Sequence, residues 1–521
     1  MKTCIIKNSW LLLIIVAVLS GLNSSSFATD GAERFPLHYH GQGNGMWDTW
    51  YVQQGETTHV YYLQTKIPNT KSKVPHTAIG HAISSDLLNW EELPGAIMPG
   101  DPNSPETAYD SGPLYTGSAV IHEGKFYNFY CGNHYCNYAE NTPKNRQSMC
   151  LATSDDGTTF TKYEGNPIVE PTRGKYFNWF EELAPFQHHA HAWVDCRDML
   201  VLKDPDNNGW LGYCVMRRKD AKDAFESSCI VLCKSDDLYH WTVGEPICTP
   251  NRFNCFEVPD VFQLDGRWFM LALTGNGYGQ SERWTDKDLT GGTIVFESDS
   301  PVEPFIEVKD NLLLSDKHGA AQGYSARTVE RNGERLMLFT RRCPGEFGNR
   351  LSWPVLLKRA GSNPGDGLNA CYWSGCDKLF TKTRTSLHNI VIDKDKPHTI
   401  ENANAHSAWM LFANSANFNT VTISLGSGLD SQPSYQILVN RKNKSVRLLD
   451  GSGKEITSRT LATLRGDLTS FRIVNDDGLI ALYLNDILAV NHCLPEYKAG
   501  SVSLSLSTET LLAELMYSAA Q

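Results

Sequence analysis

The chain has 521 residues, of which 41% are hydrophobic and 20% are charged, and its formal net charge is -11. This acidic balance argues against a nucleic-acid or anionic-membrane partner, since either surface attracts a basic face. The length exceeds what one ordinary hydrophobic core serves, so we expect two globular domains and a neutral or weakly charged substrate.

The N-terminus has the pattern of a secretory signal peptide. Lys2 and Lys7 precede an apolar run from Trp10 to Leu19, and Ser26-Phe27-Ala28 is a small-x-small sequence. The run is about ten residues long, whereas a membrane-spanning helix needs roughly 20. We therefore predict that residues 1–28 are a signal peptide and that the protein is secreted or periplasmic, with no membrane segment after cleavage. An uncleaved N-terminal anchor is the alternative.

The cysteines and histidines raise the questions of disulfides and of metal binding. Export is compatible with disulfides, although the sequence does not give their pairing. The closest cysteine pairs are Cys131/Cys136, Cys229/Cys233 and Cys371/Cys376. None is a C-x-x-C pair, which tetrahedral zinc sites usually show. His188, His189 and His191 resemble a metal site, but such a run more often lies in a surface loop. We expect no structural zinc.

From residue 29 to about residue 342, short runs rich in Val, Tyr, Phe, Trp and Ile are separated by Gly, Asp, Asn and Pro. This alternation is typical of an all-β protein, and long amphipathic helices are hard to find. Expected strands include Thr58–Gln64, Ser118–Ile121, Lys125–Tyr130, Trp210–Met216, Arg267–Leu273 and Arg335–Thr340.

A weak internal repeat favours one all-β architecture. Its members are Ser85-Asp86-Leu87 with Trp90, Ser154-Asp155 with Phe160, Ser235-Asp236-Asp237-Leu238 with Trp241, and Ser298-Asp299. They recur about every 60 to 80 residues, and each follows a strand-like run, as a four-stranded propeller blade requires. The spacing leaves room for about five blades. We therefore predict that residues 29–342 form a five-bladed β-propeller.

The rest of the chain predicts a linker and a second β domain. Residues 343–385 are rich in Gly and Pro and read as an irregular linker. Further strands are expected at Trp409–Phe412, Thr420–Leu425, Tyr435–Asn440, Ser445–Leu449, Ser470–Val474, Leu479–Leu484 and Ser501–Leu506. Alternating strands joined by tight turns are typical of an antiparallel sandwich, which we assign to residues 386–521.

Three acidic residues lie in settings that suit cleavage of a glycosidic bond. That reaction needs one carboxylic acid to protonate the leaving oxygen and one carboxylate to attack or to activate water. Asp48 lies between Trp47 and Trp50, at the start of a strand pattern. Aromatic neighbours suggest a sugar pocket, whereas a lone aspartate there more often begins a turn.

The other two acids have similar alternatives. Asp198 follows Arg197 and opens an apolar strand, where the pair could be a simple salt bridge or turn cap. Glu257 has apolar neighbours on both sides, and such a setting favours the protonated form that a general acid requires. Its alternative is a strand-edge glutamate facing water, with Pro259 marking the edge.

The three motifs, in this order, resemble glycoside hydrolase family 32, the invertase, inulinase and levanase group. Further matching stretches are Gly80-His81-Ala82 with Ser84 to Trp90, Thr116 to Val120, Phe256 to Asp260, Phe471 to Val474, and Leu482 to Asp486. The resemblance covers nearly the whole mature chain. It implies a five-bladed propeller with a funnel-like pocket and a C-terminal sandwich.

The resemblance also implies a retaining mechanism on an oligo- or polysaccharide. Asp48 would be the nucleophile, Glu257 the general acid/base, and Asp198 the residue that grips substrate hydroxyls. Further substrate-binding candidates are Trp47, Trp50, Gln64, Trp90, Ser118 and Arg197. The mechanism implies no metal and no organic cofactor.

Departures from the family pattern fall where specificity is decided. The usual Asn-Asp-Pro-Asn-Gly is here Trp47-Asp48-Thr49-Trp50-Tyr51, Met199 replaces the proline after the Arg-Asp pair, and Val258 replaces the cysteine after the acid/base. The first motif is closer to the related levansucrase-type and arabinanase-like families. We expect β-fructofuranosidase activity on sucrose or fructans. A levansucrase-like transferase, an arabinanase-like enzyme on another glycoside and a non-catalytic carbohydrate-binding propeller remain alternatives.

Overall fold

The computed structural model describes much of the chain from residue 44 onward. The described residues are 44–66, 78–101, 109–136, 144–177, 194–253, 255–274, 291–315, 319–342, 349–381, 383–392, 395, 397–400, 406–413, 419–427, 434–476, 478–494, 497, 501–507 and 510–519. The predicted signal peptide and the run His188, His189 and His191 lie outside these residues. Among the described residues, no helix is long and apolar enough to cross a membrane.

Strands dominate the fold, as predicted, and four antiparallel sheets of four strands follow one another along the chain. The first sheet contains β1 (Asn44–Gln54), β2 (Thr57–Lys66), β3 (Ala78–Ser84) and β4 (Glu91–Ile97). The second contains β5 (Tyr115–His122), β6 (Lys125–Cys136), β7 (Lys144–Ser154) and β8 (Thr161–Lys162). The third contains β9 (Cys196–Lys203), β10 (Trp210–Arg217), β11 (Ser228–Ser235) and β12 (Thr242–Cys248), with the short helix α1 (Ala224–Ser227) before β11. The fourth contains β13 (Glu257–Leu264), β14 (Arg267–Thr274), β15 (Gly292–Ser298) and β16 (Ile306–Ser315).

A further set of strands continues this order. It contains β17 (Tyr324–Arg331), β18 (Glu334–Arg342), β19 (Asn349–Leu351), β20 (Val355–Arg359) and β21 (Leu368–Tyr372), and it is followed by the 3-10 helix η4 (Ser374–Leu379). Strands β17, β18, β20 and β21 pair in that order, and β21 pairs with β31, so that they belong to one 11-stranded sheet. Within the described part of residues 343–385, short strands and η4 stand where an irregular linker was predicted, and Gly361, Gly365 and Gly367 lie between β20 and β21.

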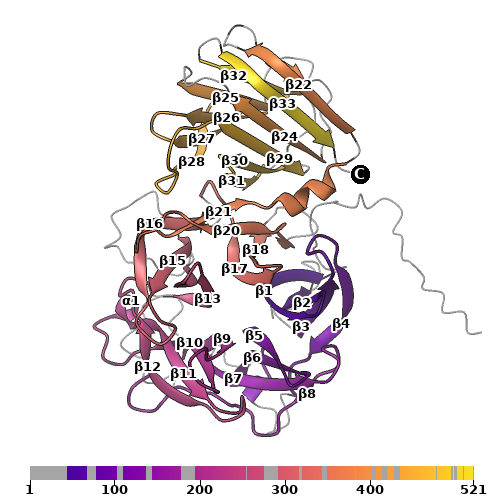
Figure 1. The fold of residues 1–521 in the computed structure, drawn as a ribbon. Coiled ribbons are helices and arrows are strands. Elements are labelled where there is room, and N and C mark those ends of the chain that lie inside the picture. Colours follow the sequence, from indigo (N-terminus) through magenta and orange to yellow (C-terminus); the bar gives the residue numbers. More distant parts are fainter. Residues whose placement is uncertain are drawn as a thin grey trace, which may run out of the picture. The chain divides into compact units, whose positions relative to one another are not determined.

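The first strands of the five sets form a closed circuit of contacts. Strand β1 contacts β5, β5 contacts β9, β9 contacts β13, β13 contacts β17, and β17 contacts β1. Figure 1 shows these strands around a common centre, with the later strands of each sheet further out. Apolar side chains fill the spaces between neighbouring sheets, as in the cluster of Phe129, Leu151, Val201 and Val231. The first strands are thus the elements from which side chains can meet at the centre.

The predicted repeat corresponds to one turn that recurs between the third and fourth strands of the sheets. In the first sheet, the hydroxyl of Ser84 accepts hydrogen bonds from the main-chain N–H of Asp86 and Leu87. In the third sheet, Ser235 accepts the same two bonds from Asp237 and Leu238. The second sheet repeats them with Ser154, Asp156 and Gly157. The Ser and Asp residues of the repeat therefore accept hydrogen bonds from nearby main-chain N–H groups of the turn, and these local bonds compete with further strand pairing.

The C-terminal region contains two sheets that share one core. The 6-stranded sheet contains β23 (His398–Ile400), β25 (Thr420–Ser427), β26 (Tyr435–Asn440), β27 (Ser445–Asp450), β28 (Glu455–Thr460) and β32 (Ser501–Leu506). The other sheet is the continuation of the 11-stranded sheet through β22 (Thr383–Ile392), β24 (His406–Ala413), β29 (Ser470–Asp476), β30 (Leu479–Leu484), β31 (Ile487–Cys493) and β33 (Thr510–Ala519). Buried residues of both sheets, including Val421, Ile437, Ile473 and Leu482, form a single cluster. All strands predicted in this region lie inside observed strands.

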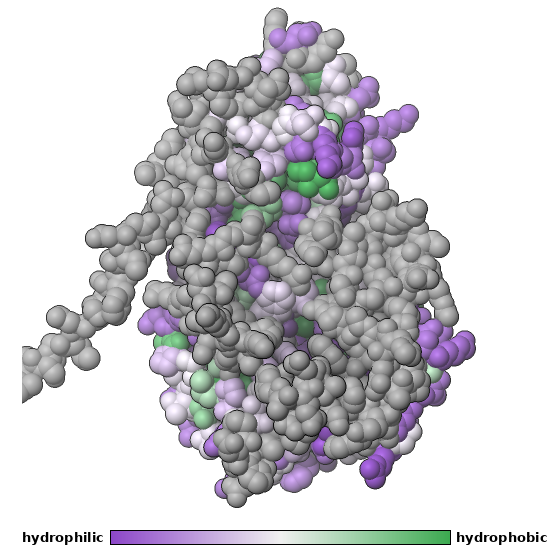
Figure 2. Space-filling model, turned by 180° about the vertical axis from the view of Figure 1, so that it is seen from behind, coloured by the Kyte–Doolittle hydropathy of each residue, from purple (hydrophilic) through white to green (hydrophobic). Residues whose placement is uncertain are grey.

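Eleven cysteines within the described residues are free thiols. They are Cys131, Cys150, Cys196, Cys214, Cys229, Cys233, Cys248, Cys255, Cys371, Cys376 and Cys493. All of them are buried except Cys493, which is partly exposed. Within the described part of the chain there is also no cluster of metal-ligating side chains. On the surface drawn in Figure 2, the coloured residues are mostly hydrophilic, and hydrophobic colour is confined to small areas.

Candidate functional site

The site is built on a distortion that recurs in the first strand of each set. The strand register shifts at Asp48 in β1, between Tyr115 and Ser118 in β5, next to Asp198 in β9, between Glu257 and Asp260 in β13, and between Tyr324 and Arg327 in β17. Positive backbone φ angles occur in these bulges at Asp48 (23°), Asp198 (55°), Val258 (51°) and Ser325 (49°). A bulge re-aims side chains, and backbone strain of this kind clusters at functional sites.

Asp48 is held by hydroxyl groups from two neighbouring strands. Thr116 of β5 donates a hydrogen bond to its Oδ2, and Ser325 of β17 donates one to its Oδ1. The residue is only 7% exposed. Burial raises the pKa of Asp48 to about 6, and the negative charge of Glu257 adds to the rise, whereas the bonds from Ser325 and Thr116 oppose it. Asp48 is therefore mainly ionised at neutral pH.

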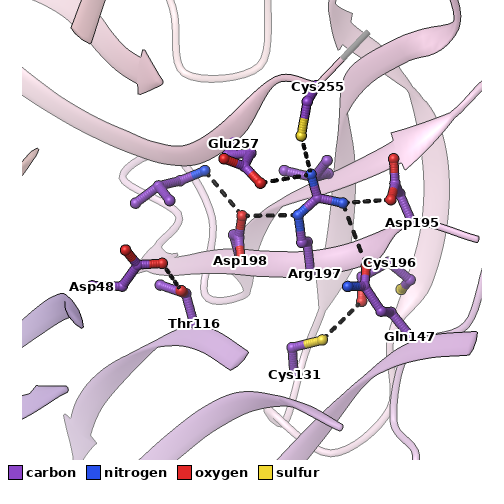
Figure 3. Close-up of polar contacts among 12 residues, drawn as sticks. Asp48, Thr116, Cys131, Gln147, Asp195, Cys196, Arg197, Asp198, Cys255 and Glu257 are labelled. Atoms are coloured by element: carbon purple, nitrogen blue, oxygen red, sulfur yellow. Dashed lines mark hydrogen bonds and ion pairs between the residues drawn. The ribbon is translucent and has the colours of Figure 1, made fainter. Parts of the chain in front are cut away.

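Arg197 joins the other two predicted acids. Its guanidinium lies 3.3 Å from Asp198 Oδ2 and 3.2 Å from Glu257 Oε1. Its Nη1 lies 2.5 Å from Asp195 Oδ1, and its Nη2, which contacts Glu257, also lies 3.1 Å from the sulfur of Cys255. Figure 3 shows Arg197 between these groups, with Asp48 and Thr116 across the site from it. One buried cation thus links the strand that carries Asp198 to the strand that carries Glu257.

Asp198 and Glu257 differ in their surroundings. Asp198 is 3% exposed, and its Oδ2 accepts a hydrogen bond from the main-chain N–H of Val258 at 3.1 Å. Burial raises the pKa of Asp198, and the charges of Glu257 and Asp48 raise it further against the opposing effect of Arg197. The side chain of Glu257 is 12% exposed, more than that of the other two acids.

Aromatic side chains lie beside Glu257. The hydroxyl of Tyr324 lies 3.4 Å from Glu257 Oε2. The ring of Trp47 packs against that of Tyr324 at a centroid distance of 5.0 Å, and both residues belong to a small apolar cluster with Val258 and Leu273. Glu257 is therefore not in the purely apolar setting that its sequence neighbours suggested, since Arg197 and Tyr324 supply polar contacts.

The structure gives the contacts of four further predicted substrate-binding residues, whose roles stay predictions. Trp50 is 2% exposed, and its indole donates a hydrogen bond to Asn128, which places it in the core between sheets. The hydroxyl of Ser118 donates to the carbonyl of Met199 and accepts from the N–H of Val201. The ring of Trp90 packs near Tyr51, and Gln64 is paired with Met46 in the sheet.

Sequence reasoning missed several residues that contact the three acids or Arg197. They are Thr116, Asp195, Cys255, Tyr324 and Ser325. Thr116 and Cys255 adjoin recognised motifs and could have been found by considering which bulge residues face the centre. Tyr324 and Ser325 belong to no motif, and their signal is only the aromatic and polar start of a strand. The roles assigned to the three acids remain predictions.

The description "Glycosyl hydrolases family 32 N-terminal domain" belongs to a family model that matches residues 49–299. The chain belongs to glycosyl hydrolase family 32. The matched region begins directly after Asp48 and contains both Asp198 and Glu257. Relatives named as sucrose-6-phosphate hydrolase, levanase and invertase are glycosidases, and this family 32 chain is an enzyme that hydrolyses O-glycosyl compounds.

Curated relatives agree with this assignment. The chain is 24% identical over 463 residues to the sucrose-6-phosphate hydrolase of Escherichia coli, a match that covers 82% of this chain and 83% of the relative. It is 27% identical over 210 residues to the levanase of Bacillus subtilis, which covers 38% of this chain and 25% of the levanase. The family 32 chain therefore spans most of the first relative and a quarter of the second.

Solved structures share the fold. A family 32 beta-fructofuranosidase from Bombyx mori matches with a TM-score of 0.70 and 17% identity, over 93% of this chain and 94% of that one. Fructan 1-exohydrolase IIa from Cichorium intybus matches with a TM-score of 0.69 and 16% identity, over 94% and 98% of the two chains. At this identity the likeness concerns the fold alone, and it extends through both the N-terminal sheets and the C-terminal sheets.

Proposed function

We propose that this family 32 enzyme is an exported β-fructofuranosidase that hydrolyses sucrose or fructans with retention of configuration. The observation that carries the proposal is the convergence of Asp48, Asp198 and Glu257, from three different sheets, on one site. Relatives named as sucrose-6-phosphate hydrolase, levanase and invertase support a fructosyl substrate. The pattern of the N-terminus supports export, and the closed circuit of first strands supports a five-bladed propeller.

In this mechanism Asp48 is the nucleophile. Its carboxylate is ionised above about pH 6 because its pKa is raised to that value, and the two hydroxyls that hold it fix its orientation. It attacks the anomeric carbon of the fructosyl unit while the bond to the leaving oxygen breaks, and a covalent fructosyl-enzyme forms. Positioning by two neighbouring strands lowers the entropic part of the barrier.

Glu257 is the general acid and then the general base. It donates its proton to the leaving oxygen in the first step and removes a proton from water in the second step, which releases fructose. Its greater exposure suits this role, because both the leaving group and the incoming water must reach it. Arg197 and Tyr324 hold its two oxygens and so restrict its orientation.

Asp198 binds substrate hydroxyls in this proposal. Its Oδ2 is already engaged by Arg197 and by the N–H of Val258, which fixes the carboxyl group and leaves its other oxygen to the sugar. Trp47 stands where the family pattern has asparagine, and its ring with that of Tyr324 offers an apolar face beside Glu257. The substrate preference is therefore expected to depend on apolar contact at this position more than on an amide hydrogen bond.

The test is incubation of the mature enzyme with sucrose, inulin, levan and arabinan, followed by NMR of the earliest products. We expect free fructose released with its original anomeric configuration from sucrose or from a fructan. Release of the opposite anomer would refute retention, and cleavage of arabinan alone would refute the fructosyl substrate. Accumulation of fructose polymer from sucrose would instead identify a transferase.

A further inference from the structure

Arg327 occupies the centre of the circuit of first strands. It comes from β17, is only 1% exposed, and donates hydrogen bonds to main-chain carbonyl oxygens of three other first strands. These oxygens belong to Pro259 of β13, Gly117 of β5 at 3.2 Å, and Asp198 of β9 at 3.5 Å. One side chain therefore connects four of the five first strands.

The carbonyls that Arg327 binds lie in the bulges that carry the site. Gly117 follows Thr116, which donates to Asp48. Asp198 is itself one of the three acids, and Pro259 lies two residues after Glu257. On its own strand, Arg327 lies two residues after Ser325, the second donor to Asp48. Each carbonyl that Arg327 binds thus belongs to a residue within two positions of one of the three acids or of a residue whose hydroxyl binds Asp48.

The charge of Arg327 also faces the acids. The charged and titratable groups around it are Asp260 at 3.8 Å, Asp198, Asp48 and Tyr51. Asp48 in turn faces Glu257, Asp198 and Arg327, together with the hydroxyls of Ser325 and Thr116. Among these influences, the positive charge of Arg327 lowers the pKa of Asp48.

We propose that Arg327 is a positioning residue for the glycosidase reaction: its guanidinium fixes the bulges of β5, β9, β13 and β17 so that the three acids keep their relative placement. The inference rests on the proposed roles of Asp48, Asp198 and Glu257. The planar guanidinium has five N–H donors in a fixed fork, and it binds several carbonyls at once. A lysine ammonium carries the same charge but not the same geometry. An Arg327→Lys variant therefore tests the placement of the bulges separately from the charge.

The experiment compares Arg327→Lys, Arg327→Gln and a matched control, Arg459→Lys. Arg459 also donates to three main-chain carbonyls, those of Leu312, Leu313 and Leu488, but it lies on β28, away from the acids. For each variant we would measure kcat and KM for sucrose between pH 4 and pH 8, normalised to the folded fraction from circular dichroism, and the thermal unfolding midpoint.

Arg327→Lys is expected to lower kcat by at least about tenfold with a smaller change in KM, because misplacement of reacting groups acts mainly on the chemical step. The acid limb of its pH profile, the range in which activity falls as the pH drops, should stay at the parental pH. Arg327→Gln is expected to lower kcat further and to move the acid limb to higher pH by about half a unit or more, since the charge is lost. Arg459→Lys should lower the unfolding midpoint and leave kcat within about twofold of the parent.

Parental kcat and an unmoved acid limb in both folded Arg327 variants would overturn the inference. So would an Arg327→Lys variant that cannot be recovered folded while Arg459→Lys can, because the residue would then serve folding and not placement. Asp48→Asn, assayed in parallel, separates the two proposals. If it hydrolyses sucrose at the parental rate, the proposed function fails. If it is inactive while the Arg327 variants match the parent, only the inference fails.

Discussion

Asp48 must carry a negative charge where little water reaches it. The residue is 7% exposed, and burial penalises the ionised form of its carboxyl group. The hydroxyls of Thr116 and Ser325 offset part of that penalty, and the result is a pKa of about 6 and not the ordinary 3.8. The nucleophile proposed here is therefore a weaker acid than an exposed aspartate, and its protonation falls within the range of pH that an assay covers.

This pKa leads to a prediction for the pH dependence of activity. Asp48 can attack only when it is ionised, so kcat/KM should fall as the pH drops through about 6. The acid limb of kcat/KM reports the free enzyme, which is the state described here. Initial rates for sucrose at low substrate concentration between pH 4 and pH 8 would measure it. A limb near pH 4 would contradict the assignment of Asp48 as a buried nucleophile.

Replacement of Asp48 by asparagine predicts a gain of stability together with a loss of activity. Because the folded-state pKa is raised, the folded protein holds the proton more tightly than the unfolded chain, and stability is lost as the pH rises from about 4 to about 6. Asp48→Asn removes that loss, on the order of 3 kcal/mol at neutral pH. Its kcat should fall by at least about a thousandfold. Denaturant unfolding at pH 4.5 and pH 7.5 would measure the difference.

The matched control for this variant is Asp204→Asn. Burial raises the pKa of Asp204, but hydrogen bonds from the side chain of Asn207 and from the N–H groups of Asp206 and Asn207 outweigh it, and the pKa is lowered. Its stabilising effect is therefore present at neutral pH and is lost as the pH falls. Asp204→Asn should be less stable than the parent at pH 7.5 and fully active. Equal signs for the two variants would contradict the argument.

At the scale of strands, the bulges determine which side chains meet. Two hydroxyl-bearing residues that lie two positions apart in β5 have different partners. Thr116 donates to Asp48, whereas Ser118 binds the main chain of β9. Only glycine fits between them, since a Cβ on Gly117 would lie 1.8 Å from the carbonyl oxygen of Phe129. The bulge therefore directs one side chain to the site and the next to the interface between sheets.

This arrangement predicts different effects for two serine substitutions. Ser325→Ala removes a hydrogen bond that lowers the pKa of Asp48, so the acid limb of kcat/KM should move to higher pH by roughly one unit. Ser118→Ala removes a serine hydroxyl from another first strand, and the acid limb of this variant should stay at the parental pH although stability falls by about 1 kcal/mol. Parallel pH profiles would compare them, and an equal shift in both variants would refute the role of Ser325.

The sequence predicted the strands better than it predicted which side chains contact one another at the site. Strands such as Tyr435–Asn440 show in the alternation of apolar residues, and that prediction is confirmed. Asp48, Asp198 and Glu257 stand in motifs, and the structure brings them to one site. Tyr324 and Ser325 could not be found in this way, because a bulge is a matter of strand register and its residues carry no distinctive spacing.

Two kinds of error in the sequence reading have physical causes. The glycines between residues 343 and 385 suggested a linker, but turns between short strands need the same residues, and β20 and β21 lie there. The tryptophan Trp50 suggested a sugar platform, yet a large aromatic side chain with a buried hydrogen-bond partner equally suits a core. Composition alone does not separate these cases.

At the scale of the molecule, the N-terminal sheets and the C-terminal sheets share one apolar cluster. Phe339 and Val355 belong to it together with Ala481, Tyr483 and Leu488 from β30 and β31. The indole of Trp353 also donates a hydrogen bond to the hydroxyl of Tyr483 at 2.8 Å. The second region therefore covers apolar surface that the first would otherwise expose to water.

Truncation tests this dependence. A chain that ends at residue 381 retains β1 to β21 but loses the partners of the shared cluster, so we expect it to aggregate or to unfold at a much lower temperature. Tyr483→Phe in the full chain should cost only about 1 kcal/mol, since one hydrogen bond is lost and packing is kept. Light scattering and thermal unfolding would measure both. A soluble truncated chain with the parental midpoint would show that the cluster contributes little.

The buried thiols have a consequence for how the chain reaches its native state. Burial raises the pKa of Cys131, Cys150 and Cys248, so that the reactive thiolate is scarce once the protein has folded. Before folding, the same sulfurs are accessible to any oxidant in an extracytoplasmic compartment. On the proposed export route, folding competes with oxidation and mispairing of these thiols, and a brief pulse of alkylating reagent during refolding would measure how fast they become buried. In the folded enzyme, Cys493 is partly exposed, and among the described cysteines it should react first with the reagent.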